Sequence, residues 1–337
     1  MGVQIKDILV FEDIDQSKLY HKTIAIDAFN MLYSFLASIR QSDGQLLMDS
    51  KGRTTSHLKG LFNRCVYFKK NDIKPIFVFD GKAHPLKEKT RELRREKKIE
   101  ANEKYQQALE LGLAQDAKKY AQQLGRLDEH MIDQAKQVMK LFGFAVIQAP
   151  SEGEAQAAQL VIEGKAFAVA SQDFDSLLFG APLVIRNLSV STKRKIAGTS
   201  IYKEIPIEFF DVKKNLETLN ISKDELIILS MLCGTDFNPS GIHGIGPKKA
   251  LKLVKEYKDK WDELFKAVDW FGAFPFAWQD VFAIFNKPTV EKNMEIVFGE
   301  LQKDELITYL NEFDFGKEQL EKQLKDLVKE KGLNRFF

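Results

Sequence analysis

The chain has 337 residues, of which 44% are hydrophobic and 29% are charged, and its formal net charge is +2. The apolar fraction is sufficient for a buried core and excludes wholesale disorder, while no apolar run approaches the roughly 20 residues of a membrane-spanning helix. Two cysteines are too few for a disulfide framework or a four-cysteine zinc site. The acidic residues near the N-terminus do not suit a secretory signal, so an intracellular protein is expected.

Short apolar runs alternate with helical patterns along the first half of the chain. The runs lack polar alternation and are rich in Val, Ile, Ala and Phe, which is typical of a mostly parallel sheet covered on both faces. After residue 206 the pattern is almost entirely helical, and residues 193–204 are predicted to form a hairpin. Strands are predicted at 23–27, 75–80, 144–148, 166–171 and 183–187, and helices from about Asn30, at 56–70, at 128–142 and from about Ser151.

Residues 82–126 form a basic, apolar-poor insertion between the second and third predicted strands. The segment holds twelve basic residues against seven acids, so it carries about +5 in a chain whose total is +2. A helical stretch with so few apolar positions cannot bury a proper face and is expected to stand clear of the core. A local basic surface of this kind is what binds phosphate groups.

Carboxylates follow four of the predicted strands at the point where each strand ends. Because ligands of open parallel sheets bind beyond the carboxyl ends of the strands, these side chains are expected to gather at one edge. A further aspartate follows the apolar helix predicted at 224–233. The predicted cluster comprises Asp27, Asp80, Glu152, Glu154, Asp173, Asp175 and Asp236.

Each of these acids also has a purely structural interpretation. Asp27, Asp80 or Asp173 could cap a helix, and Ser151 and Glu154 have the spacing of a capping box. Together, however, carboxylates without basic partners at the strand ends repel one another, and Mg²⁺ or Mn²⁺ would relieve that repulsion. The acids exceed the need of one ion, so the sequence indicates two ions about 3.5–4 Å apart, an arrangement that hydrolyses phosphodiesters.

Four basic residues of the insertion fall on one face of a predicted helix. This face begins just after Asp80, which favours a clamp on phosphate close to the acids. The alternative is a solvated helix with ion pairs such as Glu88–Arg91. The four residues are Lys87, Arg91, Arg94 and Lys98.

A glycine-rich turn followed by lysines predicts a helix-hairpin-helix motif. Glycines allow close backbone approach, Pro247 suits a first helical turn, and the free N–H groups of a helix N-terminus bind phosphate. Such a motif contacts the backbone of nucleic acid without reading sequence. The alternative is a tight turn between two helices with no ligand. The residues concerned are Gly244, Gly246, Lys248, Lys249 and Lys252.

Several segments together resemble one family of nucleases. They are AIDAFNMLY (25–33), TTSHLKG (54–60), VFDG (78–81), PSEGEA (150–155), SQDFDSLLFG (171–180), GTDF (234–237) and GIGPKKA (244–250). Their order and spacing resemble the flap endonuclease-1 family, the structure-specific 5′-nucleases of archaea and eukaryotes, and the match spans nearly the whole chain. The short hairpin near residues 193–204 looks more archaeal than eukaryotic.

The resemblance implies an α/β fold with a PIN-like, mostly parallel sheet flanked by helices, a helical arch over the active site, and a C-terminal helix-two-turn-helix region. It implies one nuclease domain at 1–325, with an N-terminal part at 1–105, the arch at about 82–126, an internal part at 128–260 that contains the hairpin motif at 238–256, and a tail at 326–337. The same seven acids would bind two Mg²⁺, or Mn²⁺ in their place. Gly2 would lie near the active site.

The resemblance also implies roles for residues that contact DNA. Lys87 and Arg94 would touch the scissile phosphate, and Tyr33 would stack on a terminal base pair. The hairpin motif would hold a K⁺ ion as well as the DNA backbone. The remaining matches are Thr54, Thr55 and Ser56, which resemble the part that recognises a one-nucleotide 3′ flap.

The C-terminal tail resembles a box that binds a sliding clamp. Leu333, Phe336 and Phe337 occupy its apolar positions, whereas Glu330 stands where the box has Gln. The expected partners are therefore branched DNA with a 5′ flap and a sliding clamp, for a monomer located in the cytoplasm of an archaeon, or in the nucleus if the source is eukaryotic. The expected activity is flap endonuclease with 5′→3′ exonuclease activity. The alternatives are a related exonuclease, a nuclease for bubbles or junctions, or an inactive DNA-binding scaffold.

Overall fold

A seven-stranded sheet forms the centre of the computed structural model, which describes residues 2–41, 43–188, 193–195 and 202–333. The strands lie in the order β1 (Glu12–Ile14), β9 (Ile207–Asp211), β6 (Leu183–Arg186), β5 (Ala168–Ala170), β2 (Thr23–Asp27), β3 (Lys74–Phe79) and β4 (Ala145–Gln148). The strands from β6 to β4 run parallel, and β9 is antiparallel to both β6 and β1. The predicted α/β class with a mostly parallel sheet is confirmed.

All five predicted strands are present, but the sequence reasoning missed two others. The expectation of an almost entirely helical chain after residue 206 is wrong at β9, and β1 was not predicted. Strand β1 has three residues, of which Glu12 and Asp13 are exposed, so it carries no apolar run. Strand β9 is a short stretch that leads directly into a helix, and its pairing with β1 and β6 is set by tertiary contacts rather than by a local pattern.

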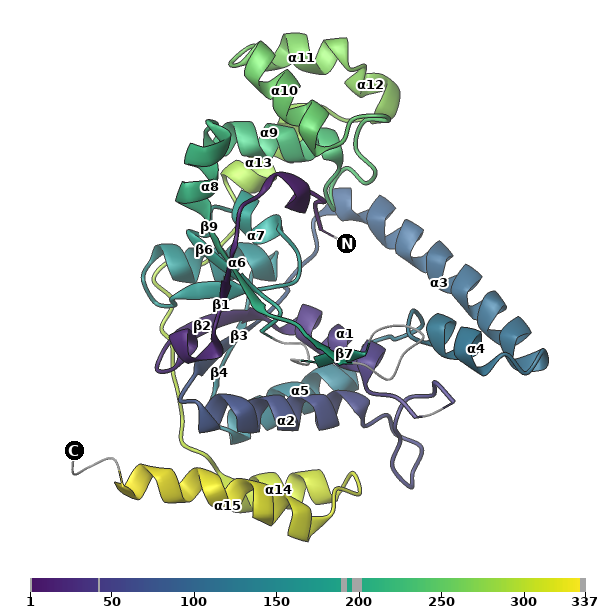
Figure 1. Ribbon diagram of the computed structural model, residues 1–337, viewed down its shortest axis with the longest axis vertical. Coiled ribbons are helices and arrows are strands. Elements are labelled where there is room, and N and C mark those ends of the chain that lie inside the picture. Colours follow the sequence, from purple (N-terminus) through teal and green to yellow (C-terminus); the bar gives the residue numbers. More distant parts are fainter. Residues whose placement is uncertain (1, 42, 189–192, 196–201, 334–337) are drawn as a thin grey trace.

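Both faces of the sheet are buried, which explains why its strands lack polar alternation. Along β2, Ile24 and Ile26 pack into one hydrophobic core and Ala25 into the other. Figure 1 shows helices on either side of the strands. The helices outside the insertion are α1 (Ala28–Ser38), α2 (Ser56–Lys70), α5 (Glu129–Leu141), α6 (Gly153–Ile162), α7 (Asp175–Leu178), α8 (Val212–Leu219), α9 (Lys223–Cys233), α10 (Pro247–Tyr257), α11 (Trp261–Ala267), α12 (Trp270–Ala273), α13 (Trp278–Asn286), α14 (Lys303–Asn311) and α15 (Lys317–Leu333), with short 3₁₀ turns η1 (Lys6–Ile8) and η2 (Gln16–Leu19). A third 3₁₀ turn, η3 (Pro85–Lys87), lies at the start of the insertion.

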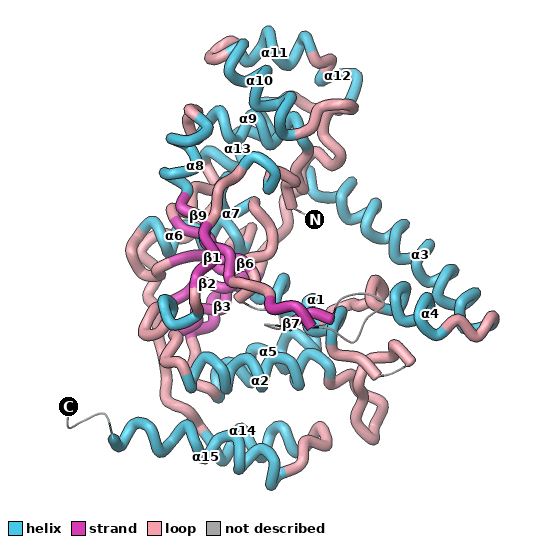
Figure 2. The backbone as a smooth tube through the Cα atoms, viewed as in Figure 1, coloured by secondary structure: helices cyan, strands magenta, loops and turns pink. Residues whose placement is uncertain are grey.

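The basic insertion forms an arch of two helices, α3 (Glu88–Glu110) and α4 (Ala114–Ala121). Figures 1 and 2 show α3 leaving the body of the molecule and α4 returning toward it. The buried residues of the two helices are Thr90 and four alanines, so the pair packs through small side chains. The expectation that this segment stands clear of the core is confirmed.

The helical regions lie at the two ends of the molecule, with the strands between them (Figure 2). Helices α10 to α12 are at one end, and α14 and α15 are at the other. The predicted hairpin is present as β7 (Lys193–Lys195) paired antiparallel with β8 (Tyr202–Glu204). No helix in the described ranges is long and apolar enough to cross a membrane.

Candidate active site

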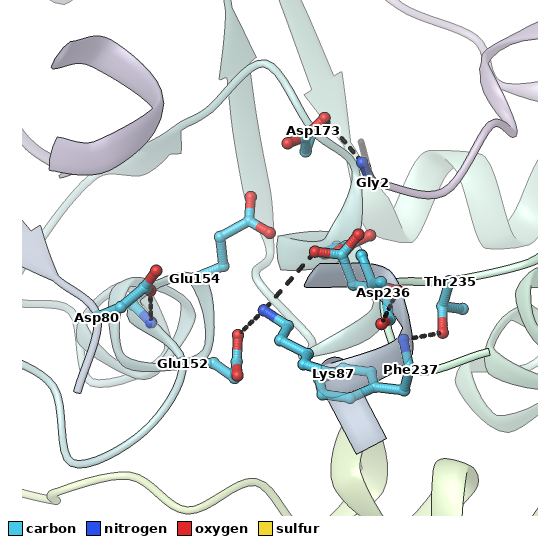
Figure 3. Close-up of polar contacts among 12 residues, drawn as sticks. Gly2, Asp80, Lys87, Glu152, Glu154, Asp173, Thr235, Asp236 and Phe237 are labelled. Atoms are coloured by element: carbon cyan, nitrogen blue, oxygen red, sulfur yellow. Dashed lines mark hydrogen bonds and ion pairs between the residues drawn. The ribbon is translucent and has the colours of Figure 1, made fainter. Parts of the chain in front are cut away.

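The sheet topology brings the acids of four strands to one edge. Strands β5, β2, β3 and β4 are consecutive neighbours, and all four run in the same direction. Asp27 is the last residue of β2, Asp80 directly follows β3, and the other pairs follow β4 and β5. The predicted gathering of Asp27, Asp80, Glu152, Glu154, Asp173 and Asp175 is therefore confirmed, and Asp236 joins them from the loop after α9 (Figure 3).

Backbone amides at the starts of two helices hold Asp27 and Asp80 in place. Asp27 is the N-cap of α1, and its Oδ1 accepts a hydrogen bond from the Asn30 amide at 3.0 Å. Oδ1 of Asp80 accepts from the Gly153 amide at 2.6 Å. A Cβ on Gly153 would lie 2.7 Å from that same oxygen, so only glycine allows this approach. Asp27 thus caps a helix and also belongs to the cluster, so the two interpretations of this residue are compatible.

The N-terminal segment is part of the site. The amide of Gly2 donates to Asp173 Oδ1 at 3.1 Å, and the amide of Val3 donates to Asp175 Oδ1 at 3.0 Å. Gly2 lies beside the acids, as the resemblance implied. It is buried, and a Cβ at this position would lie 2.7 Å from the Cβ of Asp173, which is why the contact requires glycine.

The capping box proposed for Ser151 and Glu154 does not form. Helix α6 begins at Gly153 with Glu152 as its N-cap, and the Glu152 side chain bonds none of the helix amides. Glu154 instead accepts a hydrogen bond from the Ser171 hydroxyl at 2.6 Å, and that hydroxyl accepts from the Asp173 amide at 3.1 Å. The sequence reasoning missed Ser171, and no local signal could have found it because its partner is 17 residues away.

Burial and mutual repulsion make the cluster electrostatically unfavourable. Burial, with the neighbouring Asp80 carboxylate, raises the pKa of Asp27 to about 7. Burial, with Asp236 and Asp173 nearby, likewise raises the pKa of Asp175 to about 7. The pKa of Glu154 is well above its usual range for the same two reasons. These groups take a proton readily unless a cation compensates their charge.

Two cations of the arch supply part of that compensation. Nζ of Lys87 pairs with Glu152 and lies 3.7 Å from Asp236 Oδ2 (Figure 3). Nη2 of Arg94 lies 2.9 and 2.7 Å from the two carboxylate oxygens of Asp236. Burial lowers the pKa of the Lys87 ammonium, but the surrounding carboxylates outweigh this and raise it overall. The strand ends themselves hold no basic partner, as expected, and the compensating cations come from the arch, the segment expected to lie close to the acids.

The donor set suits hard divalent cations, although the carboxylates are not arranged around one. Among the residues that the structure describes, no three His, Cys, Asp or Glu side chains are placed to ligate one ion. Lys87 and Arg94 engage Glu152 and Asp236 instead. Oxygen donors of this kind, held close together despite their repulsion, fit Mg²⁺ or Mn²⁺. A bound cation would take over the charge compensation that Lys87 provides.

Comparison with known proteins identifies the family to which this site belongs. The XPG N-terminal domain family matches residues 1–101, and the XPG I-region family matches residues 143–236. Flap endonuclease 1 of Pyrococcus furiosus is 44% identical to this chain, over 98% of this chain and 95% of its own length. The structure of flap endonuclease-1 from Methanococcus jannaschii superposes with a TM-score of 0.74 at 38% identity, over 97% of this chain and 98% of that one.

This chain belongs to the flap endonuclease 1 family. The catalytic core of Rad2 in complex with a DNA substrate shares the fold with a TM-score of 0.71 at 21% identity, over 97% of this chain and all of that one. The family membership confirms the resemblance seen in the sequence and the type of fold it implied.

The basic residues of the arch differ in the groups that surround them. Lys98 donates to the Gly125 carbonyl at 2.9 Å, and its Nζ lies 5.7 Å from the centre of the exposed Tyr33 ring. Tyr33 of α1 and Lys98 of the arch helix α3 are therefore neighbours. Arg91 lies 3.7 Å from Glu88 and is exposed, as the solvated-helix interpretation predicted for that pair. Lys87 and Arg94, by contrast, pair with carboxylates of the acid cluster.

The segment matched to 3′-flap recognition is partly buried. Ser56 is fully buried, and its hydroxyl accepts from the Leu47 amide at 2.8 Å. Thr55 is 7% exposed, and its amide donates to the Leu47 carbonyl at 2.7 Å. In this conformation the Ser56 side chain cannot meet DNA and instead fixes the loop before α2. Thr54 is the more accessible of the three expected residues.

The predicted hairpin motif joins α9 to α10. Gly244 has a φ of +74°, a conformation that favours glycine, and Gly246 is the N-cap of α10 with no side chain bonded to the first amides. Lys249 Nζ lies 3.4 Å from the Gly244 carbonyl, and Lys248 and Lys252 are exposed. The first turn of α10 thus presents free N–H groups beside lysines.

At the other end of the chain, Leu333 ends α15, and Phe336 and Phe337 lie outside the described residues.

Proposed function

We propose that this chain is a divalent-metal-dependent nuclease that removes 5′ flaps from branched DNA in replication and repair. The observation that carries the proposal is the gathering of seven carboxylates at one sheet edge, with Lys87 and Arg94 of the arch directed at them. Membership of the flap endonuclease 1 family supports it. Such a site serves the hydrolysis of a phosphodiester.

The carboxylates would hold the metal ions, and the arch would act on the phosphate. Two Mg²⁺, or Mn²⁺ in their place, would supply an activated water and compensate negative charge. Arg94 can engage phosphate oxygens through two N–H groups, whereas Lys87 acts as a point charge. Both stabilise charge that develops as the phosphodiester breaks. To do so, they leave Asp236 and Glu152 and turn to the DNA. The residues that would hold the ions are Asp27, Asp80, Glu152, Glu154, Asp173, Asp175 and Asp236.

The DNA duplex would be held away from the metals. The free amides of α10 and Lys248, Lys249 and Lys252 would bind phosphates without reading bases, and Gly244 and Gly246 let the backbone come close. A K⁺ ion at this motif is part of the proposal. Tyr33 would stack on a terminal base pair beside the arch, and Thr54 would contribute to recognition of a 3′ flap. Arg91 and Lys98 would add positive charge along the passage.

The proposal extends to partners and cell compartment. The protein would act as a monomer inside the cell, in the cytoplasm if its source is archaeal, and its tail would bind a sliding clamp through Leu333, Phe336 and Phe337. It would consist of one nuclease domain at 1–325 followed by that tail. A second activity, 5′→3′ exonuclease, follows from the same site, because a recessed 5′ end offers the same phosphodiester to the same acids.

Cleavage assays on three labelled substrates test the proposal. A double-flap DNA, a blunt duplex and a bubble are each incubated with the protein in Mg²⁺, in Ca²⁺ and in a chelator. We expect rapid Mg²⁺-dependent release of the 5′ flap, slower cutting of the duplex end and little cutting of the bubble. Ca²⁺ should bind without supporting turnover. Preferred cutting of the bubble would favour the alternative of a bubble or junction nuclease, and no cutting of any substrate would favour a DNA-binding scaffold.

A further inference from the structure

One buried hydrogen bond joins the arch to the acid cluster without involving a charge. The hydroxyl of Thr90, in the first turn of α3, donates to the backbone carbonyl of Asp236 at 2.7 Å. The two residues are 146 positions apart in the sequence. Thr90 is 7% exposed, and the other buried residues of α3, a helix described along its whole length, are Ala101 and Ala108.

The direction of this hydrogen bond is unusual for a helical threonine. In a helix, a threonine hydroxyl commonly bonds the carbonyl four residues earlier. Thr90 instead bonds the Asp236 carbonyl in the loop that follows α9. That loop is itself fixed by a buried network, in which the Thr235 hydroxyl donates to Asn238 Oδ1 at 2.7 Å and Asn238 Nδ2 donates to the Met231 carbonyl at 2.7 Å. Thr90 therefore bonds a rigid acceptor.

Thr90 lies between the two cations that approach the acids. Lys87 is three residues before it and Arg94 is four residues after it, so all three side chains share one face of the helical segment. All three also meet Asp236: Thr90 at the carbonyl, Lys87 at 3.7 Å and Arg94 at 2.7 Å from the carboxylate. The ion pairs must break when these cations turn to a DNA phosphate, whereas the bond from Thr90 to the carbonyl need not.

We propose that Thr90 is a positioning residue, which anchors the base of the arch to the Asp236 loop and so sets where Lys87 and Arg94 meet the scissile phosphate. This inference rests on the proposed function. Thr90 touches neither substrate nor metal and acts through its two neighbours. Misplacing a reacting group by about 1 Å can cost up to 100-fold in rate, so a single neutral hydrogen bond here has a larger effect on cleavage than on folding.

Three substitutions test the role of the hydroxyl. Thr90→Val keeps the shape and removes the donor, Thr90→Ser keeps the donor, and Thr308→Val removes a threonine hydroxyl from a local bond to Asp304 on α14. We expect Thr90→Val to slow single-turnover flap cleavage by roughly 10- to 100-fold with an unchanged Kd for flap DNA. Thr90→Ser should return to within threefold of the parent, and Thr308→Val should match the parent. A Val variant within threefold of the parent, or a Ser variant as slow as Val, would overturn the proposal.

Two further measurements separate positioning from a general structural role. If Thr90 acts through Arg94, adding Thr90→Val to Arg94→Ala should slow cleavage by much less than it slows the parent, whereas multiplicative effects would contradict the proposal. Hydrogen exchange of the α3 amides needs no activity. Exchange over residues 88–98 should rise in Thr90→Val but not in Thr90→Ser, and equal exchange in parent and Val would reject the anchor. If the parent does not cut flaps but exchange still rises in Thr90→Val alone, the proposed function is wrong. The role of Thr90 in holding the base of the arch to the Asp236 loop is then still supported.

Discussion

Nη2 of Arg94, on the arch helix, donates hydrogen bonds to both carboxylate oxygens of Asp236, at 2.9 and 2.7 Å, although the two residues are 142 positions apart in the sequence. The contact joins the basic insertion to the acid cluster. It also shows that the arch helix is oriented by charge as well as by packing, because α3 buries few side chains. The same geometry places Arg94 and Lys87 where a phosphate could replace the carboxylate as their partner.

Replacing either cation with alanine should impair cleavage far more than binding. Removing one electrostatic contact to a transition state typically costs about 10²–10³ in rate, so Lys87→Ala and Arg94→Ala should each slow single-turnover cleavage by about that factor with nearly unchanged Kd. Arg95→Ala is the matched control, since Arg95 is exposed on the same helix and should retain the parent rate. Rates within threefold of the parent for Lys87→Ala and Arg94→Ala would remove both residues from the mechanism.

Neutralising Asp175 should stabilise the metal-free protein and abolish cleavage. With a folded-state pKa of about 7, against an ordinary value of 3.8, Asp175 lowers stability progressively as the pH rises from about 4 to 7. In chelator at pH 8, the free energy of unfolding of Asp175→Asn should therefore exceed that of the parent by at least about 1 kcal/mol, and the variant should unfold at a higher temperature. At pH 5 the difference should shrink, because the parent carboxyl is then protonated.

Added Mg²⁺ provides the second half of that test. It should raise the unfolding temperature of the parent at pH 8 and raise that of Asp175→Asn much less, since a ligand that binds only the folded state stabilises it. Asp116→Asn, on the exposed surface of α4, should behave as the parent throughout. Retained Mg²⁺-dependent cutting by Asp175→Asn would refute the role of this residue as a metal ligand.

Lysines at the start of α10 should contribute to DNA affinity through phosphate contacts alone. Lys248→Ala and Lys252→Ala should weaken duplex binding equally for all sequences, and each lost contact should reduce the slope of log K against log salt concentration by about 0.9. Lys322→Ala is the control, because α15 lies at the opposite end of the molecule from α10 (Figure 1). A changed base preference would show instead that this segment reads sequence.

Protonation of a buried histidine should contribute to acid unfolding. His57 is fully buried, its Nε2 lies 3.0 Å from Gln134 Oε1, and burial lowers its pKa from 6.5 to about 4. The unfolded chain takes up this proton first, so stability is present above pH 6.5 and is lost as the pH falls toward 4. Between pH 7 and pH 5 the loss from this group is roughly 2 kcal/mol.

Chemical denaturation of the parent and of His57→Gln at both pH values measures this contribution. The variant should lose less stability than the parent on acidification, by about that amount. Taking the difference between the two proteins cancels the opposing effect of the cluster carboxyls, which are common to both. Equal losses in the two proteins would show that His57 does not titrate in this way.

Deleting residues 330–337 should separate clamp binding from catalysis. The tail would place Leu333, Phe336 and Phe337 in an apolar pocket of the clamp, so the truncated chain should lose stimulation by the clamp and keep its intrinsic cleavage rate. Titration calorimetry with the sliding clamp measures the affinity of both chains. Equal affinity for the full and shortened chains would assign the contact to another segment.

Sequence patterns predicted the site residues that follow from local structure. They did not predict contacts between residues that lie far apart in the chain. Asp27 and Asp80 stand at the ends of two apolar runs that are readily predicted to be strands. Their convergence then follows from the topology of a parallel sheet. The helix after Asp80 placed Lys87 close to the acids, but the individual contacts of Lys87, Ser171 and Thr90 could not be read, because their partners lie 17 to 149 positions away. Strands β1 and β9 were missed for a related reason, because two of the three residues of β1 are exposed and β9 is set by its pairing with β1 and β6.

The burial of Gly2 against Asp173 has a practical consequence for handling this protein. Any residues fused ahead of Gly2 must leave the molecule from within a few ångströms of the acid cluster, since its amide is only 3.1 Å from Asp173. A purification tag at that end would bring its own charges or histidines to the place where divalent ions are wanted. A tag that leaves no residues after proteolytic removal keeps foreign side chains away from the acids, and preparations made with and without such removal should not be compared as one enzyme.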